Sequence, residues 1–279
     1  MDSEDGTAGI TLVCCGLIGT LVADDGLIER SFAEAIATQG IVSGTSAFAR
    51  RMSQVHRARG GAPGDVLRVL FPDNEARAQA AQLAFEQALP EALGRGVIEP
   101  VPGAVEALEE IRDSGRQICV LTSFPRRVLD LVLRGADLGS HIDLALSREE
   151  APRGFPAPDL ALTAVLKAGA AAVQDVAMVH ATGAGVECGR RSAARVVVGV
   201  LTGPHSATRL RGAGASHVIG SIAELPRLLT KVDPRPARAA PYATNGDMAA
   251  DSHRRAPAAG VKAAMEVPSQ VGERRRLEH

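Results

Sequence analysis

The sequence predicts an α/β protein with a doubly wound parallel sheet and an inserted α-helical domain. Three observations indicate this fold: short apolar runs, helical patterns between them, and a long stretch with few strand signals after the first run. Short apolar runs are typical of buried parallel strands, and their alternation with helices is typical of doubly wound sheets. We expect five strands, at residues 10–15, 118–123, 176–181, 196–202 and 217–221.

The same patterns divide the chain into segments. Residues 8–23 and 100–231 carry the strand–helix alternation and predict the α/β core. Residues 24–99 are helical and predict a cap domain inserted after the first strand. Residues 232–279 are rich in Pro, Ala and Arg without periodicity, which predicts a disordered tail. Ligands of doubly wound sheets bind at the carboxyl ends of the strands, so we expect the functional site there.

Composition and charge exclude several partners. The chain has 279 residues, a formal charge of −1 at pH 7 and four cysteines. A nearly neutral chain does not favour nucleic acid or an anionic membrane as a partner. The N-terminal residues lack the pattern of a signal peptide, and no apolar run approaches transmembrane length. Because the cysteines do not form a disulfide pattern, we expect a cytoplasmic protein with reduced thiols.

Three segments carry a resemblance to a known family. They are ITLVCCGLIGTLVADDG at 10–26, APRGFPAPDL at 151–160 and VLTGPHSATRLRGAGASHVIGSIAELPRLL at 200–229. Over residues 8–230 the chain resembles the phosphonatase-like members of the haloacid dehalogenase superfamily, with the segments in the family's order and spacing. The resemblance implies a Rossmann-like core with a helical cap. It also implies, for the family, an aspartate nucleophile and a magnesium ion that support phosphoryl transfer.

The positions that the resemblance assigns to the family's reactive groups hold other residues here. The nucleophile position is Gly16, which has no side chain to attack phosphorus. The acid/base position two residues later is Ile18. The lysine with which phosphonatases form a Schiff base corresponds to His56, and an imidazole cannot form an imine. The basic residue that balances the phosphate charge corresponds to Phe155.

The family's magnesium carboxylates fall at Ala181 and Gly185, within VHATGAGVECG at 179–189. Mg²⁺ prefers oxygen ligands, usually carboxylates, which neither residue supplies. We therefore expect no metal and no cofactor. Since phosphoryl transfer depends on positioned charge, the leading hypothesis is a pseudoenzyme that keeps core and cap. It would act as a binding, regulatory or scaffold protein, with a homodimer through the cap as in phosphonatases.

Two alternatives remain open at this point. The first is a divergent, metal-independent enzyme that uses the same cleft for a non-phosphate substrate, such as one in a biosynthetic reaction. The apolar Ile18 and Phe155 favour a ligand other than phosphate. The second is a working hydrolase of the family, which requires that the family's motifs align with other residues than those given above. Asp24 and Asp25 lie past the turn, beyond the position of a nucleophile.

Several polar residues could still act in the cleft. The hydroxyl groups of Thr20, Thr122 and Ser123 could bind a phosphate or another small anion, or could cap turns and helices. Arg153 could partly replace the missing basic residue. The basic cluster at 49–61 is typical of a solvated helix face. The candidate cleft residues are Thr20, Thr122, Ser123, His180, His56, Arg153 and Cys14.

His180 stands where the family has the glycine before its first magnesium carboxylate, so the resemblance places it close to Ala181 and Gly185. It could bind an anion when protonated, act as an acid or base, or fill space. Cys14 could pair with His180 as a nucleophile or pack as a small hydrophobic residue. It should share the strand face of Gly16, because side chains alternate along a strand.

Overall fold

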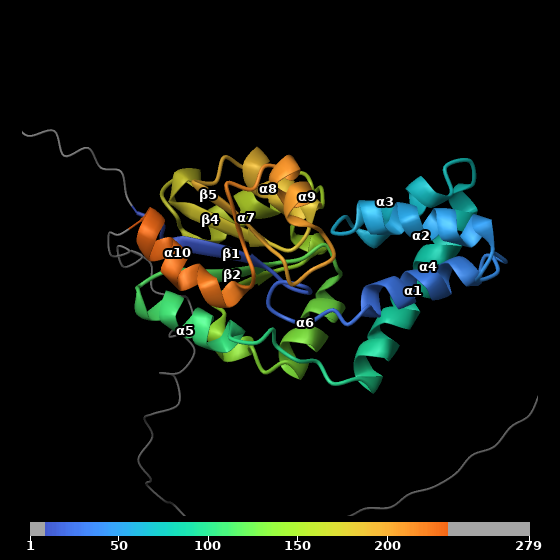
Figure 1. The fold of residues 1–279 in the computed structure, drawn as a ribbon, viewed down its shortest axis with the longest axis horizontal. Coiled ribbons are helices and arrows are strands. Elements are labelled where there is room, and N and C mark those ends of the chain that lie inside the picture. Colours follow the sequence, from blue (N-terminus) through green and yellow to red (C-terminus); the bar gives the residue numbers. More distant parts are fainter. Residues whose placement is uncertain (1–8, 234–279) are drawn as a thin grey trace, which may run out of the picture. The chain divides into compact units, whose positions relative to one another are not determined.

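The core of the computed structural model is a six-stranded, fully parallel sheet with strand order β3-β2-β1-β4-β5-β6 (Figure 1). The structure describes residues 9–233. The strands are β1 (Leu12–Gly16), β2 (Gln117–Leu121), β3 (Leu144–Leu146), β4 (Val176–His180), β5 (Val196–Val200) and β6 (His217–Ile219). The predicted doubly wound sheet is confirmed. The edge strand β3 was not predicted, whereas β6, the three-residue strand at the opposite edge, was.

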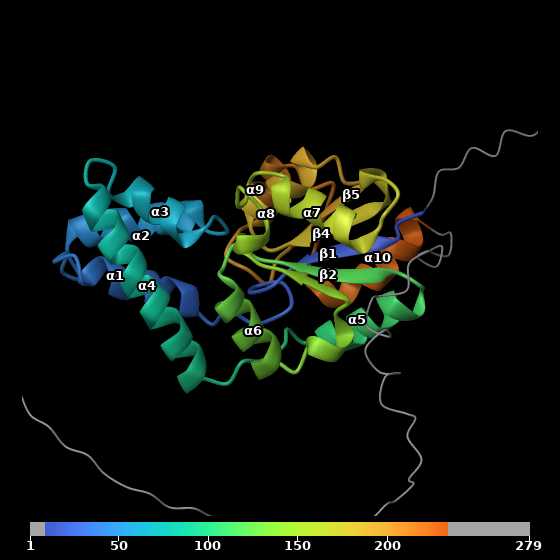
Figure 2. The ribbon, with the colours of Figure 1, turned by 180° about the vertical axis from the view of Figure 1, so that it is seen from behind.

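Helices cover both faces of the sheet (Figures 1 and 2). One face carries α5 (Ala104–Asp113), α6 (Arg126–Gly135) and α10 (Leu225–Val232), and the other carries α7 (Asp159–Ala168), α8 (Gly183–Arg191) and α9 (Ala207–Ala213). Side chains of β1 alternate between these layers: Val13 and Cys15 belong to the first apolar cluster, and Cys14 to the second. This double coverage explains why the strands are nearly continuous apolar runs. Short 3-10 helices are η1 (Gly139–His141), η2 (Arg148–Glu150), η3 (Val173–Asp175) and η4 (Ile222–Glu224).

The segment between β1 and α5 is helical, as the sequence predicts. It contains α1 (Leu27–Ala37), α2 (Ser46–Ala58), α3 (Pro63–Leu70) and α4 (Glu75–Arg95). Their buried apolar residues belong to the same cluster as one face of the sheet, and among them the rings of Phe32 and Phe85 lie 4.4 Å apart between centroids. The segment is therefore a helical cap inserted into the α/β core.

Core side chains bind backbone carbonyl groups at the end of α2. His205 Nε2 lies 3.2 Å from the carbonyl oxygen of His56, and Arg209 Nη2 donates to that of Arg57. Ser123 Oγ donates to the carbonyl oxygen of Gly60 at 2.7 Å. The last carbonyl groups of a helix have no partner within the helix, so the core satisfies groups that would otherwise need water.

Asp233, the last residue that the structure describes, is buried. Asp233 follows α10, accepts a hydrogen bond from the backbone N–H of Ile10 and lies 3.7 Å from Arg116 Nη2. The core thus includes the first two residues of the segment that the sequence analysis assigned to a tail, and positions 234–279 of that segment lie outside the described residues. Within residues 9–233, no helix combines the length and apolar character that crossing a bilayer requires.

Candidate functional site

The carboxyl ends of β1 and β4 meet at a site centred on His180. Gly16 is the last residue of β1, His180 is the last of β4, and Gly185 lies in the first turn of α8. A Cβ atom at Gly16 would lie 2.6 Å from His180 Nδ1, and one at Gly185 would lie 2.1 Å from the same atom. Both distances are far below van der Waals contact. The imidazole therefore occupies the space into which side chains at positions 16 and 185 would project.

The His180 side chain is buried and uncharged. It is 6 % exposed, and its ring packs edge-on against Phe155 with 4.8 Å between centroids. Burial lowers the pKa of His180 to about 4. Nε2 is buried without a hydrogen-bond partner among the described residues. The apolar Phe155 thus contacts the imidazole where the resemblance places a charge-balancing base.

Acid should destabilise the protein through His180. In the unfolded chain its pKa is about 6.5, whereas in the folded chain it is about 4, so between these pH values the unfolded state binds more protons. The free energy of unfolding should fall by about 3 kcal/mol as the pH drops from 6.5 to 4, and this loss should stop below pH 4. Urea denaturation of the wild type and of His180→Asn across this range measures the difference. An equal acid loss in both proteins would contradict the assignment.

The residues present do not fit the magnesium ion of the family. Gly16 and Gly185 carry no oxygen ligand, and a neutral imidazole fills the space between them. Ala181 is fully buried, and a Cβ at Gly203 would lie 2.4 Å from its Cβ, so the loop after β5 fills the room for a longer side chain. Among residues 9–233, no three His, Cys, Asp or Glu side chains gather in a metal-binding arrangement.

The three hydroxyl candidates all bond to the backbone. Thr20 Oγ1 accepts a hydrogen bond from the N–H of Ala181 at 3.1 Å, and Thr122 Oγ1 accepts one from that of Phe124 at 3.2 Å. Ser123 Oγ holds Gly60 of the cap. The bond of Thr20 joins the loop after β1 to the end of β4, that of Thr122 is local, and that of Ser123 contacts the cap. All three are structural roles, which the sequence left open beside anion binding.

A small cavity of about 50 Å³ adjoins these groups. Its lining includes Ile18, Thr122, Ser123, Phe155 and His180. The cavity therefore brings together three of the predicted cleft residues, Thr122, Ser123 and His180.

Cys14 contacts a second thiol rather than His180. A hydrogen bond with Cys119, together with burial, raises the pKa of Cys14 well above its ordinary value. Burial also raises the pKa of Cys188 to about 12. A thiol that stays protonated is a poor nucleophile.

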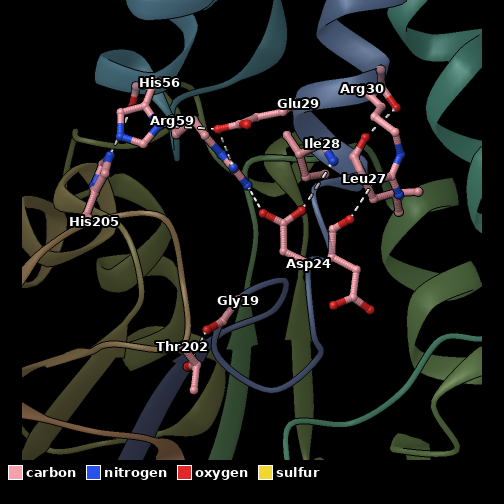
Figure 3. Close-up of polar contacts among 12 residues, drawn as sticks. Gly19, Asp24, Leu27, Ile28, Glu29, Arg30, His56, Arg59, Thr202 and His205 are labelled. Carbon is pink, nitrogen blue, oxygen red and sulfur yellow. Dashed lines mark hydrogen bonds and ion pairs between the residues drawn. The ribbon is translucent and has the colours of Figure 1, made fainter.

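Two other candidates lie away from the cavity. Arg153 is 70 % exposed and forms a two-pronged ion pair with Asp159. His56 is half exposed, and its Nδ1 lies 3.3 Å from Glu29 Oε1 (Figure 3). Neither side chain lines the cavity at His180.

Arg59 is a residue of the site that the sequence analysis missed. It is 7 % exposed although it belongs to the basic cluster at 49–61, and it pairs with Asp24 and Glu29 (Figure 3). This ion pair connects the end of α2 to the segment that enters the cap. The signal that could have indicated it was the Arg-Gly-Gly at 59–61, where a helix ends and the cap chain turns.

His205 is the second residue that was missed. The N–H of Gly183 donates to its Nδ1 at 2.8 Å, so Nε2 carries the proton that is donated to the carbonyl of His56. The pKa of His205 is lower than that of an ordinary histidine, and burial is the largest cause. Its position shortly after the β5 strand, at the carboxyl edge of the sheet, was the available signal.

Comparisons with known proteins agree with this architecture. A family model described as haloacid dehalogenase-like hydrolase matches residues 10–191. Phosphonoacetaldehyde hydrolases of Bordetella pertussis and Bordetella avium are 31 % and 32 % identical to the chain over 160 and 166 residues. These alignments cover 49 % and 50 % of this chain and 58 % of each relative, so the chain matches less than two thirds of the length of these relatives.

Solved structures show the same fold. A hydrolase from Pseudomonas syringae is 25 % identical, with a TM-score of 0.70 over 80 % of this chain and 99 % of that one. A phosphonoacetaldehyde hydrolase-like protein from Oleispira antarctica has a TM-score of 0.73 at 20 % identity, over 85 % of this chain and 98 % of that one. With the family model matching well over half of its length, the chain belongs to the haloacid dehalogenase-like hydrolase family.

Proposed function

We propose that this chain is a family member without aspartyl-phosphate chemistry that acts by binding a small molecule between cap and core. The observation that supports this most directly is the position of the His180 imidazole, which fills the space above Gly16 and Gly185. The two glycines and the histidine are mutually dependent, because a larger residue at either glycine would overlap the ring. The space where the family has its reactive carboxylates is therefore filled by the His180 ring and is not empty.

The chemistry of the family requires groups that this arrangement does not provide. Phosphoryl transfer needs a nucleophile and positioned positive charge. Gly16 has no nucleophile, and the pKa of His180 keeps its ring neutral at physiological pH. The cap nevertheless keeps its hydrogen bonds to the core through Ser123, His205 and Arg209. A cap that stays docked over an altered centre suits binding.

Phosphate release with and without Mg²⁺ tests the proposal. We expect no release above the enzyme-free blank from phosphonoacetaldehyde or para-nitrophenyl phosphate, because no carboxylate stands at the end of β1. Asp24→Asn and Asp25→Asn test whether one of these aspartates is the nucleophile in place of position 16, since they are the carboxylates nearest to Gly16 along the chain. Magnesium-dependent release that either substitution abolishes would overturn the proposal.

A metal-independent enzyme is the second candidate, and one observation favours it. His180 Nε2 has no partner among the described residues, and the ring lines a cavity. A base with a pKa of about 4 is weak, and no carboxylate orients the ring. Once a ligand is known, His180→Asn separates the two functions: ligand turnover that this variant loses would indicate the enzyme, whereas binding without turnover would indicate the proposed role.

A further inference from the structure

A second hollow lies beside the site, between the cap helices α2 and α3 and the core helices α8 and α9. This lateral cleft has a volume of about 700 Å³, within the usual range of small-molecule sites. Of its lining residues, only Arg59, Gly61 and Phe155 also line the cavity at His180. The residues that matter for its chemistry are Arg57, Val66, Val69, Ala184, Arg209 and Ala213.

The charges of the lateral cleft are unevenly compensated. Its carboxylates already have partners: Asp65 binds Arg68 at 2.7 Å, and Glu187 binds Arg191 at 2.6 Å. The guanidinium group of Arg57 has no ion pair among the described residues, and that of Arg209 bonds only to a backbone carbonyl. A guanidinium carries five N–H donors, so most donors of both groups remain available to a ligand.

The remaining lining is largely apolar. Val66 and Ala213 come from the cap and the core respectively, Pro156 adds to the lining, and Phe155 lines both the cleft and the cavity. Val69 is 59 % exposed within this lining, although valine is usually buried. An apolar wall beside two uncompensated cations is complementary to a molecule that has both an apolar body and a negative head.

Two backbone N–H groups at the start of α8 are already engaged within the protein. The N–H of Gly183, which lines the cleft, already donates to His205 Nδ1, and that of Gly185 donates to Thr182 Oγ1. Arg57 and Arg209 are the lining groups that carry a positive charge without an ion pair among the described residues, so they distinguish an anion from a neutral molecule here.

We propose that the lateral cleft binds an organic anion, with its carboxylate or phosphate head on Arg57 and Arg209 and its aliphatic body on Val66 and Val69. This inference deepens the proposed function and rests on it, since it names the ligand class of a binding protein. Planar guanidinium groups suit such heads because they donate two parallel hydrogen bonds to carboxylate or phosphate oxygens.

Calorimetric titration of the full chain tests the ligand class, with hexanoate, octanoate, octyl phosphate and octan-1-ol as probes. Octanoate should bind about tenfold more tightly than hexanoate, because two more methylene groups leave water. It should also bind about tenfold more tightly than octan-1-ol, which has no charge for the arginines. The comparison of octanoate with octyl phosphate decides which head fits better. Equal binding of octanoate and octan-1-ol, or no octanoate binding at millimolar concentration, would overturn the proposal.

Substitutions locate the binding. Arg57→Ala and Arg209→Ala should each weaken octanoate binding about tenfold, whereas Arg211→Ala, an exposed arginine on the same helix as Arg209 but outside the cleft, should leave it within twofold. Unchanged binding in both cleft variants would refute the site. A thermal melt of each variant confirms that it is folded.

A negative charge introduced into the cleft provides a second test that leaves the arginines in place. Val69→Glu places a carboxylate in the cleft and should abolish octanoate binding, while Leu83→Glu, which is 62 % exposed on α4, should not. Phosphate release measured in the same samples keeps the two proposals separate. Octanoate binding together with magnesium-dependent phosphate release would overturn the proposed lack of phosphoryl-transfer chemistry and leave the lateral cleft standing. Absence of both binding and release would refute the lateral cleft and leave that part of the proposed function standing.

Discussion

Replacing Gly185 with alanine is expected to lower the free energy of unfolding by about 3 kcal/mol. In an ordinary helix this substitution stabilises the protein, because glycine has the higher conformational entropy in the unfolded chain. Here the added Cβ would lie 2.1 Å from Nδ1 of the buried His180 ring, and the overlap outweighs the helical preference. Urea denaturation of the wild type and the variant measures the change.

The matched control is Gly94→Ala in α4. No atom lies within 4 Å of the Cβ that would be added there, so the free energy of unfolding should rise by about 0.5 to 1 kcal/mol. His180→Ala removes the ring from the clash. In the double variant His180→Ala/Gly185→Ala the two effects should couple by about 2 kcal/mol. Strict additivity would show that the imidazole does not fill this space.

Replacing Arg59 with methionine is expected to cost about 3 to 5 kcal/mol. Arg59 is 7 % exposed and Asp24 is 11 % exposed, so the substitution leaves a nearly buried carboxylate without its partner. Breaking one side of a buried ion pair costs more than the pair itself contributes, because the remaining charge cannot reach water. Urea denaturation followed by circular dichroism provides the measurement.

Two further variants separate charge from packing. Asp24→Asn/Arg59→Met removes both charges and should recover much of the loss, since the neutral amide can still accept the hydrogen bond of the Ile28 N–H. Arg50→Met changes an exposed arginine of α2, the helix that ends just before Arg59, and should change the free energy of unfolding by less than about 0.5 kcal/mol. A double variant as unstable as Arg59→Met alone would mean that side-chain packing, not the ion pair, is responsible.

The fold could be predicted from the sequence because buried parallel strands carry a strong local pattern. Runs such as ITLVCC at 10–15 and VAMVHA at 176–181 are apolar on both faces, and both sheet faces are covered by helices. The edge strand β3 was missed: Asp143 comes directly before its Leu-Ala-Leu, so the apolar run is only three residues long. The basic cluster of the cap indicated a solvated helix face, yet Arg59 lies beyond the helix end and is buried against Asp24.

The sequence named candidate residues of the site but did not predict the contacts between them. The family resemblance implied that His180 lies near Gly16 and Gly185, because it aligns His180 beside the magnesium carboxylate positions. It could not indicate that one ring excludes side chains at both glycines, since this depends on distances of a few ångströms between β1, β4 and α8. His205 was missed for a similar reason: its partners, Gly183 and the carbonyl of His56, are 22 and 149 positions away.

The bonds between core and cap have an evolutionary consequence. On the cap side they use carbonyl oxygens at positions 56, 57 and 60, and every amino acid carries that same oxygen. The identities of residues 56 and 57 can therefore drift without loss of these bonds, whereas a change at Ser123, His205 or Arg209 removes a donor. The cap is in this sense an interchangeable module: a different helical insert could be grafted onto this core if the end of its second helix keeps the same register.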